Sequence, residues 1–144
     1  MNRTLSKMKV KMKTILVIVL ILFLGGIQSL GQGIEFLKGD YNAALEKAKQ
    51  EGKMLFVDFY ADWCGPCKRM AKDVFTLAVV GNYFNEKFVS VQINAEDPVN
   101  RVVVKQNKVR SYPTLAFFDA DGKLLSRTEG ALDCTAFIKL AKVV

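Results

Sequence analysis

Residues 54–68 read MLFVDFYADWCGPCK, and this stretch decides how the rest of the chain is interpreted. Its first seven residues are almost all apolar and rich in aromatics, which predicts a strand buried on both faces. Cys64 and Cys67 follow at a spacing of two, and Pro66 suits the first turn of a helix. A buried strand that leads into such a pair at a helix start favours a redox-active dithiol.

The segments around this stretch alternate between helical and strand patterns. Asp40 is placed to cap a helix over 41–50, and Gly52 is placed to end it. We further predict helices over 64–75, 98–107 and 135–143, a short helical piece at 79–85, and strands over 88–93, 114–118 and 124–128. This order predicts one α/β domain with a mixed central sheet and helices on both faces.

The first 31 residues have the three-part pattern of a secretory signal peptide. Five basic residues and no acidic residue precede an apolar run over 15–24, and small residues follow it. We expect cleavage after Gly31, which leaves residues 32–144 as the mature domain. The alternative is a retained membrane anchor, although the run is shorter than the roughly 20 residues that span a bilayer. In both cases we expect an exported domain in the periplasm or cell envelope.

The composition excludes several classes of function. The chain has 21 Lys+Arg and 14 Asp+Glu. Without the leader, 16 basic and 14 acidic residues remain, interspersed along the chain, so we expect no nucleic-acid partner. No histidine is present, which excludes Ser-His and Cys-His catalysis. A structural zinc needs four ligands, and the chain has three cysteines and no histidine, so we expect no metal. We also expect no other cofactor and a monomer.

The two cysteines of the motif are expected to have different roles. Thiol–disulfide exchange needs a thiolate that attacks a disulfide and a second thiol that releases the mixed disulfide. Cys64 is expected at the helix start, where N–H groups and the helix dipole stabilise a thiolate, so we predict it as the nucleophile. Cys67, inside the first turn and less exposed, is predicted as the resolving thiol. An inert disulfide is the alternative. Cys134 is expected to be a buried spectator.

The motif WCGPCK after VDFYAD closely resembles the thioredoxin family, and SYPT over 111–114 resembles a second landmark of that family. The similarity covers most of residues 38–142. Within the superfamily the chain is similar to exported thioredoxin-like domains and to the periplasmic C-terminal domain of the transmembrane thiol:disulfide interchange reductases. The resemblance implies the thioredoxin fold and an enzyme that exchanges protein disulfides and thiols.

The resemblance also implies roles for residues outside the dithiol. Pro113 matches the cis-proline of the family, which exposes the backbone of the preceding residue, here Tyr112, for pairing with a substrate chain. Trp63 matches an aromatic that shields the disulfide, and Gly130 matches a glycine near the docking surface. The remaining residues of the active-site motif are Gly65, Pro66 and Lys68. The alternatives are an ordinary loop at Tyr112, a packing role for Trp63 and a solvated Lys68.

Asp58 matches the buried acid of the family. A carboxyl group inside an apolar strand has a raised pKa, and it could exchange a proton with Cys67. The alternative is a strand-end aspartate with its carboxyl group in solvent. The family often places a lysine beside this acid, on the neighbouring strand. When residues 91–94 are aligned with that strand, Gln92 takes the place of the lysine. Because a neutral partner compensates less charge, we expect Asp58 to stay protonated to a higher pH.

The dipeptide Gly65-Pro66 resembles the reducing type of thioredoxin. Oxidases and isomerases of the superfamily usually have a histidine at this place, which stabilises their reduced form. We therefore expect a reductase of protein disulfides. We also expect a membrane electron-donor protein to return its cysteine pair to the reduced state. A disulfide oxidase or isomerase is one alternative, and a non-catalytic domain that holds a partner chain is another.

Overall fold

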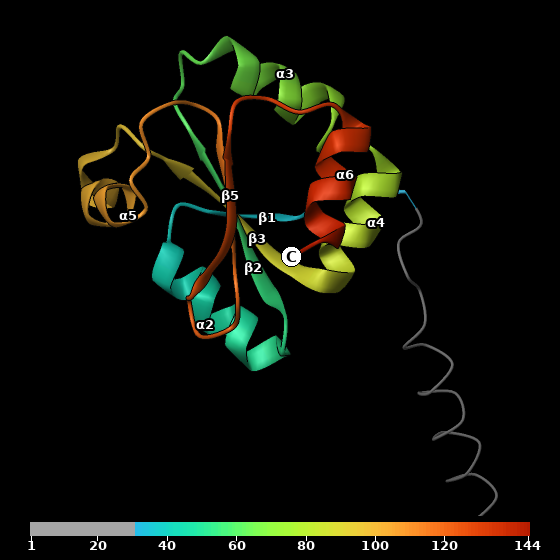
Figure 1. The fold of residues 1–144 in the computed structure, drawn as a ribbon, viewed down its shortest axis with the longest axis horizontal. Helices are drawn as coiled ribbons and strands as arrows, with labels where there is room; N and C mark the ends of the chain where they lie inside the picture. Colours follow the sequence, from blue (N-terminus) through green and yellow to red (C-terminus); the bar gives the residue numbers. More distant parts are fainter. Residues whose placement is uncertain (1–30) are drawn as a thin grey trace, which may run out of the picture.

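In the computed structural model, which describes residues 31–144, five strands form one mixed sheet (Figure 1). They are β1 (Phe36–Lys38), β2 (Met54–Tyr60), β3 (Phe88–Asn94), β4 (Thr114–Phe118) and β5 (Leu124–Glu129). The order across the sheet is β1-β3-β2-β4-β5. Strands β1 and β2 run parallel to β3, whereas β4 is antiparallel to both β2 and β5. The strand that leads to Cys64 therefore lies in the centre of the sheet.

Within residues 31–144, five helices and one 3-10 turn cover the sheet. They are α2 (Tyr41–Glu51), α3 (Gly65–Asp73), α4 (Ala78–Lys87), η1 (Pro98–Asn100), α5 (Arg101–Gln106) and α6 (Cys134–Lys142). Helices α2 and α5 lie on one face, and α3, α4 and α6 lie on the other (Figure 1). Asp40 caps α2 by accepting from the Ala43 N–H, and Gly52 ends it with a φ of 63°, as the sequence predicts.

The two faces of β2 contribute to two different cores. Leu55, Val57 and Phe59 pack beneath α2, whereas Phe56 packs among aromatic rings beneath α3, α4 and α6. Asp58 lies on the same face as Phe56, because alternate residues of a strand share a face. Truncating a buried phenylalanine such as Phe56 to alanine costs about 3–5 kcal/mol. These cores hold the carboxyl end of β2 in place.

The predicted mixed sheet with helices on both faces is confirmed, with local differences such as α4, which is longer than the short helical piece predicted at 79–85. Strand β1 was not predicted, because three residues are too few to show a period. The segment 88–93 alternates in sequence, yet Ser90 is buried, because both faces of β3 are covered. The helix predicted over 98–107 begins as the 3-10 turn η1.

The predicted signal peptide lies outside the described residues except for Gly31. Within residues 31–144, none of the helices has both the length and the apolar character that crossing a membrane requires.

Candidate active site

Cys64 and Cys67 lie where β2 gives way to α3, and a disulfide joins them with their Cα atoms 5.3 Å apart. Cys64 is the N-cap of α3, and its Sγ accepts a hydrogen bond of 3.1 Å from the Cys67 N–H. Gly65 and Pro66 form the start of the helix, where the missing N–H of proline costs little. In the reduced state, the Cys67 N–H and the positive end of the helix dipole stabilise a thiolate at Cys64.

Both cysteines are almost inaccessible in this oxidised state. Cys64 is 3% exposed and Cys67 is 5% exposed, so the prediction that Cys67 is the less exposed of the two is wrong. Tyr60 and Tyr112 pack against the cluster that the two cysteines form with Ala61. The two cysteines differ instead in their surroundings, since Cys64 caps the helix and Cys67 lines a pocket that opens to the surface.

Trp63 presents a large apolar surface beside the disulfide and is 68% exposed. Its indole N–H donates to Glu96 Oε2 at 2.9 Å, and its ring meets the ring of Tyr112 edge-on with centroids 5.9 Å apart. These two contacts hold the indole in one orientation. An exposed aromatic held in this way is suited to contact a partner chain.

The loop before β4 lies against the disulfide. The Tyr112–Pro113 bond is cis, as the resemblance implies. Gly130, with a φ of 92°, donates its N–H to the Pro113 carbonyl at 2.8 Å, so the structure brings these three residues together. Within residues 31–144 the backbone N–H and C=O of Tyr112 have no hydrogen-bond partner. Unpaired backbone groups beside a disulfide can pair with an extended chain.

Asp58 is buried on β2, with 2% of its surface exposed, which excludes a carboxyl group in solvent. Its Oδ2 accepts a hydrogen bond of 3.0 Å from Gln92 Nε2, and its Oδ1 has no partner within the described residues. Burial raises the pKa of Asp58 from 3.8 to about 6, and the hydrogen bond from Gln92 offsets part of this rise. The neutral partner expected beside Asp58 is Gln92, and the pKa of Asp58 is raised as expected.

A pocket of about 270 Å³ is lined by both Asp58 and Cys67. Such a volume holds water, so a proton can pass between the two groups through a water molecule. Lys68 is exposed and lines the same pocket, as do Tyr60 and Asp62. Burial raises the pKa of Tyr60, with smaller contributions from Asp62 and Asp58, which keeps its phenol neutral.

Cys134 is the first residue of α6 and packs against the aromatic core around Phe56. It is half-buried rather than buried, which corrects the prediction. The disulfide belongs to a separate cluster with Ala61 and the two tyrosines. Across residues 31–144, no three Cys, Asp or Glu side chains are arranged to hold a metal ion.

Sequence reasoning missed Glu96 and Tyr60. Glu96 follows β3, which runs parallel to β2, so the segments after these two strands meet at one edge of the sheet. This rule, applied to the residues after 94 and after 60, could have placed Glu96 near Trp63. Tyr60 ends the apolar run of β2 and shows no separate signal in the sequence.

The thioredoxin-like domain family matches residues 41–144. The chain belongs to this family. Over 106 residues it is 32% identical to the thiol:disulfide interchange protein DsbD of Pseudoalteromonas atlantica, which covers 72% of this chain and 18% of that protein. Over 79 residues it is 40% identical to the chloroplastic thioredoxin-like protein CITRX of Oryza sativa subsp. japonica, which covers 54% of this chain and 39% of that protein. The chain thus spans less than a fifth of this DsbD relative.

Solved structures of thioredoxin-like proteins agree with this assignment. A solution structure of a candidate disulphide-isomerase from Bacteroides thetaiotaomicron is 38% identical, with a TM-score of 0.70, and the match covers 78% of this chain and 93% of that one. A thioredoxin from Thermus thermophilus, 21% identical with a TM-score of 0.68, covers 76% of this chain and 87% of that one and shows the same fold. This thioredoxin-like domain carries a CxxC pair, Cys64–Cys67, which is the dithiol that thiol–disulfide exchange requires.

Proposed function

We propose that this thioredoxin-like protein is a reductase of protein disulfides in the cell envelope. The observation that carries the proposal is the Cys64–Cys67 pair at the N-terminus of α3, with Gly65-Pro66 between the cysteines. No histidine is available to stabilise the reduced form further, as the histidine of oxidases and isomerases does. A dithiol of this kind donates electrons readily.

The proposed reaction begins with the reduced pair. The Cys64 thiolate attacks one sulfur of a substrate disulfide, forms a mixed disulfide and displaces the other substrate sulfur as a thiolate, which takes a proton from solvent. The Asp58 carboxylate then accepts the proton of the Cys67 thiol through the pocket that both groups line. The Cys67 thiolate attacks Cys64 Sγ and displaces the second substrate sulfur as a thiolate, which takes a proton from solvent. Two electrons have passed to the substrate, and the Cys64–Cys67 disulfide remains.

Four further assignments complete the proposal. The basic and apolar leader is the reason to propose export, with a membrane anchor if the leader is retained. An exported reductase needs a supply of electrons from the cell, so we assign it a membrane electron-donor protein as partner. Trp63 and the unpaired backbone of Tyr112 are assigned to bind the substrate chain. We assign a monomer as the working unit.

Insulin reduction tests this function on residues 32–144, with dithiothreitol as electron source. Cys64→Ser should abolish turnover, because no thiolate is left at the helix N-terminus. Cys67→Ser should accumulate a mixed disulfide with the substrate, visible by mass spectrometry, because its resolving thiol is absent. Cys134→Ser is the matched control and should keep wild-type activity. Turnover by Cys64→Ser would support a non-catalytic partner-binding domain and contradict the proposal.

A second candidate is a disulfide isomerase. It is favoured by one observation, the 38% identity to the Bacteroides thetaiotaomicron structure named for that activity. Refolding of ribonuclease with scrambled disulfides separates the two, since an isomerase restores activity without consuming a reductant. We expect net reduction of the scrambled protein and slow recovery of its activity.

A further inference from the structure

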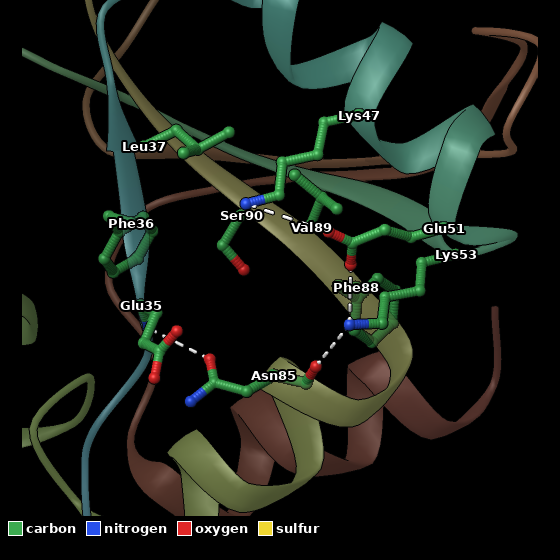
Figure 2. Close-up of a pocket in the computed structure, with 10 residues that line it drawn as sticks. All are labelled: Glu35, Phe36, Leu37, Lys47, Glu51, Lys53, Asn85, Phe88, Val89 and Ser90. Atoms are coloured by element: carbon green, nitrogen blue, oxygen red, sulfur yellow. Dashed lines mark hydrogen bonds and ion pairs between the residues drawn. The ribbon is translucent and has the colours of Figure 1, made fainter. Parts of the chain in front are cut away.

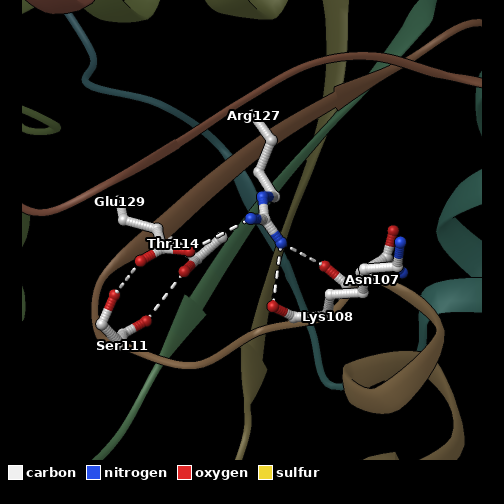
Figure 3. A network of polar contacts seen from close by, with 6 residues as sticks. All are labelled: Asn107, Lys108, Ser111, Thr114, Arg127 and Glu129. Carbon is white, nitrogen blue, oxygen red and sulfur yellow. Dashed lines mark hydrogen bonds and ion pairs between the residues drawn. The ribbon is translucent and has the colours of Figure 1, made fainter.

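Side chains from β5 hold the loop that precedes β4, as Figure 3 shows. Arg127 Nη1 donates to the carbonyls of Asn107 (2.7 Å) and Lys108 (2.9 Å), and its Nη2 pairs with Glu129 Oε1 at 3.1 Å. The other carboxylate oxygen of Glu129 accepts a hydrogen bond of 2.7 Å from the Ser111 hydroxyl. Arg127 and Glu129 lie two residues apart, on one face of β5. One ion pair therefore holds both ends of the segment 107–111.

Few other hydrogen bonds fix residues 110–113. For residues 110–113, the remaining hydrogen bonds in the described chain join the Ser111 carbonyl to Thr114 Oγ1 and the Pro113 carbonyl to the Gly130 N–H. Lys108 adopts a φ of 51°, in the left-handed region that a lysine seldom occupies. The two hydrogen bonds from Arg127 lie at this strained turn. Residues 107–109 also bond to the end of α5, whereas beyond them the polar contacts that hold the loop come mainly from the side chains of β5.

The loop presents Tyr112 to the redox centre. The Tyr112 ring packs against the cysteine pair and against Trp63, while its backbone N–H and C=O stay unpaired within residues 31–144. A chain that brings its disulfide to Cys64 must pass these two groups. A small movement of the loop would change the distance between Tyr112 and that chain, without moving either sulfur.

We propose that Arg127 and Glu129 are positioning residues that hold the Tyr112 backbone in place for an incoming protein substrate, an inference that rests on the proposed function. Neither side chain contacts Cys64 or Cys67, so they act on docking and not on the exchange of electrons. The ion pair is part-exposed, and such a pair contributes little to stability by itself. Charge-assisted bonds to two carbonyls and a hydroxyl are stronger and directional. Their loss loosens the loop without unfolding the domain.

The test compares a protein substrate with a small one. For Arg127→Ala and Glu129→Ala we expect the KM for insulin to rise about three- to tenfold. The single-turnover rate with 5,5′-dithiobis(2-nitrobenzoate) and the reduction potential should stay at wild-type values, because the thiol chemistry is untouched. Glu129→Gln keeps an acceptor for Ser111 and should recover part of the loss. The matched control, Lys139→Ala, removes an exposed charge from α6 and should change none of these values.

Two results would overturn the positioning role. One is an insulin KM that stays at the wild-type value in both alanine variants. The other is an equal loss toward insulin and the small disulfide, which would show a general structural defect. If Arg127→Ala does not fold, Ser111→Ala removes a single hydroxyl and should raise the insulin KM by a smaller factor; an unchanged KM there also contradicts the role. A wild-type protein that fails to reduce insulin would refute the proposed function itself, and this inference with it.

Discussion

Two buried side-chain oxygens on the same face of the sheet have no hydrogen-bond partner within the described residues, Asp58 Oδ1 and Ser90 Oγ. They share a face because Asp58 is in register with Gln92, two residues along β3 from Ser90. Asp58 lines the pocket that reaches Cys67. Ser90 lines a different pocket of about 390 Å³, near the start of β2 (Figure 2).

The surroundings of the two oxygens differ. In the pocket of Figure 2 the other polar groups pair with one another, since Lys53 Nζ contacts Glu51 (2.9 Å) and the Asn85 carbonyl (3.0 Å). A hydroxyl is neutral, so the cost of leaving Ser90 unpaired is the same at every pH. Asp58 can ionise, so the cost of leaving its Oδ1 unpaired depends on pH. Cys67 lines the same pocket as Asp58. Only the unpaired oxygen beside the dithiol can take part in proton transfer.

The largest expected effect is on the pH dependence of stability. The raised pKa means that folded Asp58 holds its proton up to about pH 6, whereas the unfolded residue releases it near 3.8. The stability associated with the protonated group is complete below pH 3.8 and is lost as pH rises through about 6. Asp58→Asn should therefore be more stable than wild type at pH 7, by up to about 3 kcal/mol, and similar at pH 3.5. Urea unfolding at both values measures the difference, and an equal difference at both would contradict it.

The next effect is on catalysis. Asp58→Asn cannot accept the Cys67 proton, so release of the mixed disulfide at pH 7 should slow by about tenfold or more. The measurement is stopped-flow reduction of insulin, and Asp62→Asn is the matched control because Asp62 lines the same pocket. Equal rates for the two variants would show that the carboxyl group of Asp58 has no special role.

A smaller effect is expected from the partner of Asp58. Gln92→Ala removes the hydrogen bond that lowers the pKa of Asp58, so this pKa should rise above about 6, by about one pH unit. NMR titration of the Asp58 carboxyl carbon measures it. Asn94→Ala removes a similar bond, to the exposed Asp62, and should leave the pKa of Asp58 unchanged. A fall in that pKa in Gln92→Ala would refute the assignment of the hydrogen bond.

Ser90→Ala should have the smallest effect. It removes the unpaired hydroxyl and leaves the packing almost intact, so we expect a stability change within about 1 kcal/mol. Insulin reduction should stay at the wild-type rate. A large loss of activity would mean that the pocket of Figure 2 is coupled to the dithiol, and the contrast between the two oxygens would fail.

The parts of the site that depend on local spacing could be predicted from the sequence. The dithiol at a helix start and the buried Asp58 follow from one continuous stretch. Gln92 follows from the resemblance to the thioredoxin family, which places a partner of the buried acid on the neighbouring strand. Contacts between distant side chains could not be predicted in the same way. The bonds of Glu96 to Trp63 and of Arg127 to Asn107 depend on loop paths and on the register of β4 with β5.

The near-equal burial of Cys64 and Cys67 could not be predicted either. A helix position indicates which cysteine caps the helix. It does not indicate that Tyr60 and Tyr112 pack against the cysteine pair. These two tyrosines belong to segments separated by about 50 residues, and only the folded sheet brings them together.

The reduction potential of the Cys64–Cys67 pair tests the central claim most directly. It is measured on residues 32–144 with Cys134→Ser, by equilibration in glutathione or dithiothreitol buffers, so that the third thiol cannot contribute. A reductase of the thioredoxin type predicts a value near roughly −270 mV. A value of roughly −120 to −180 mV would place the protein among oxidants and isomerases and contradict the proposed direction of electron flow.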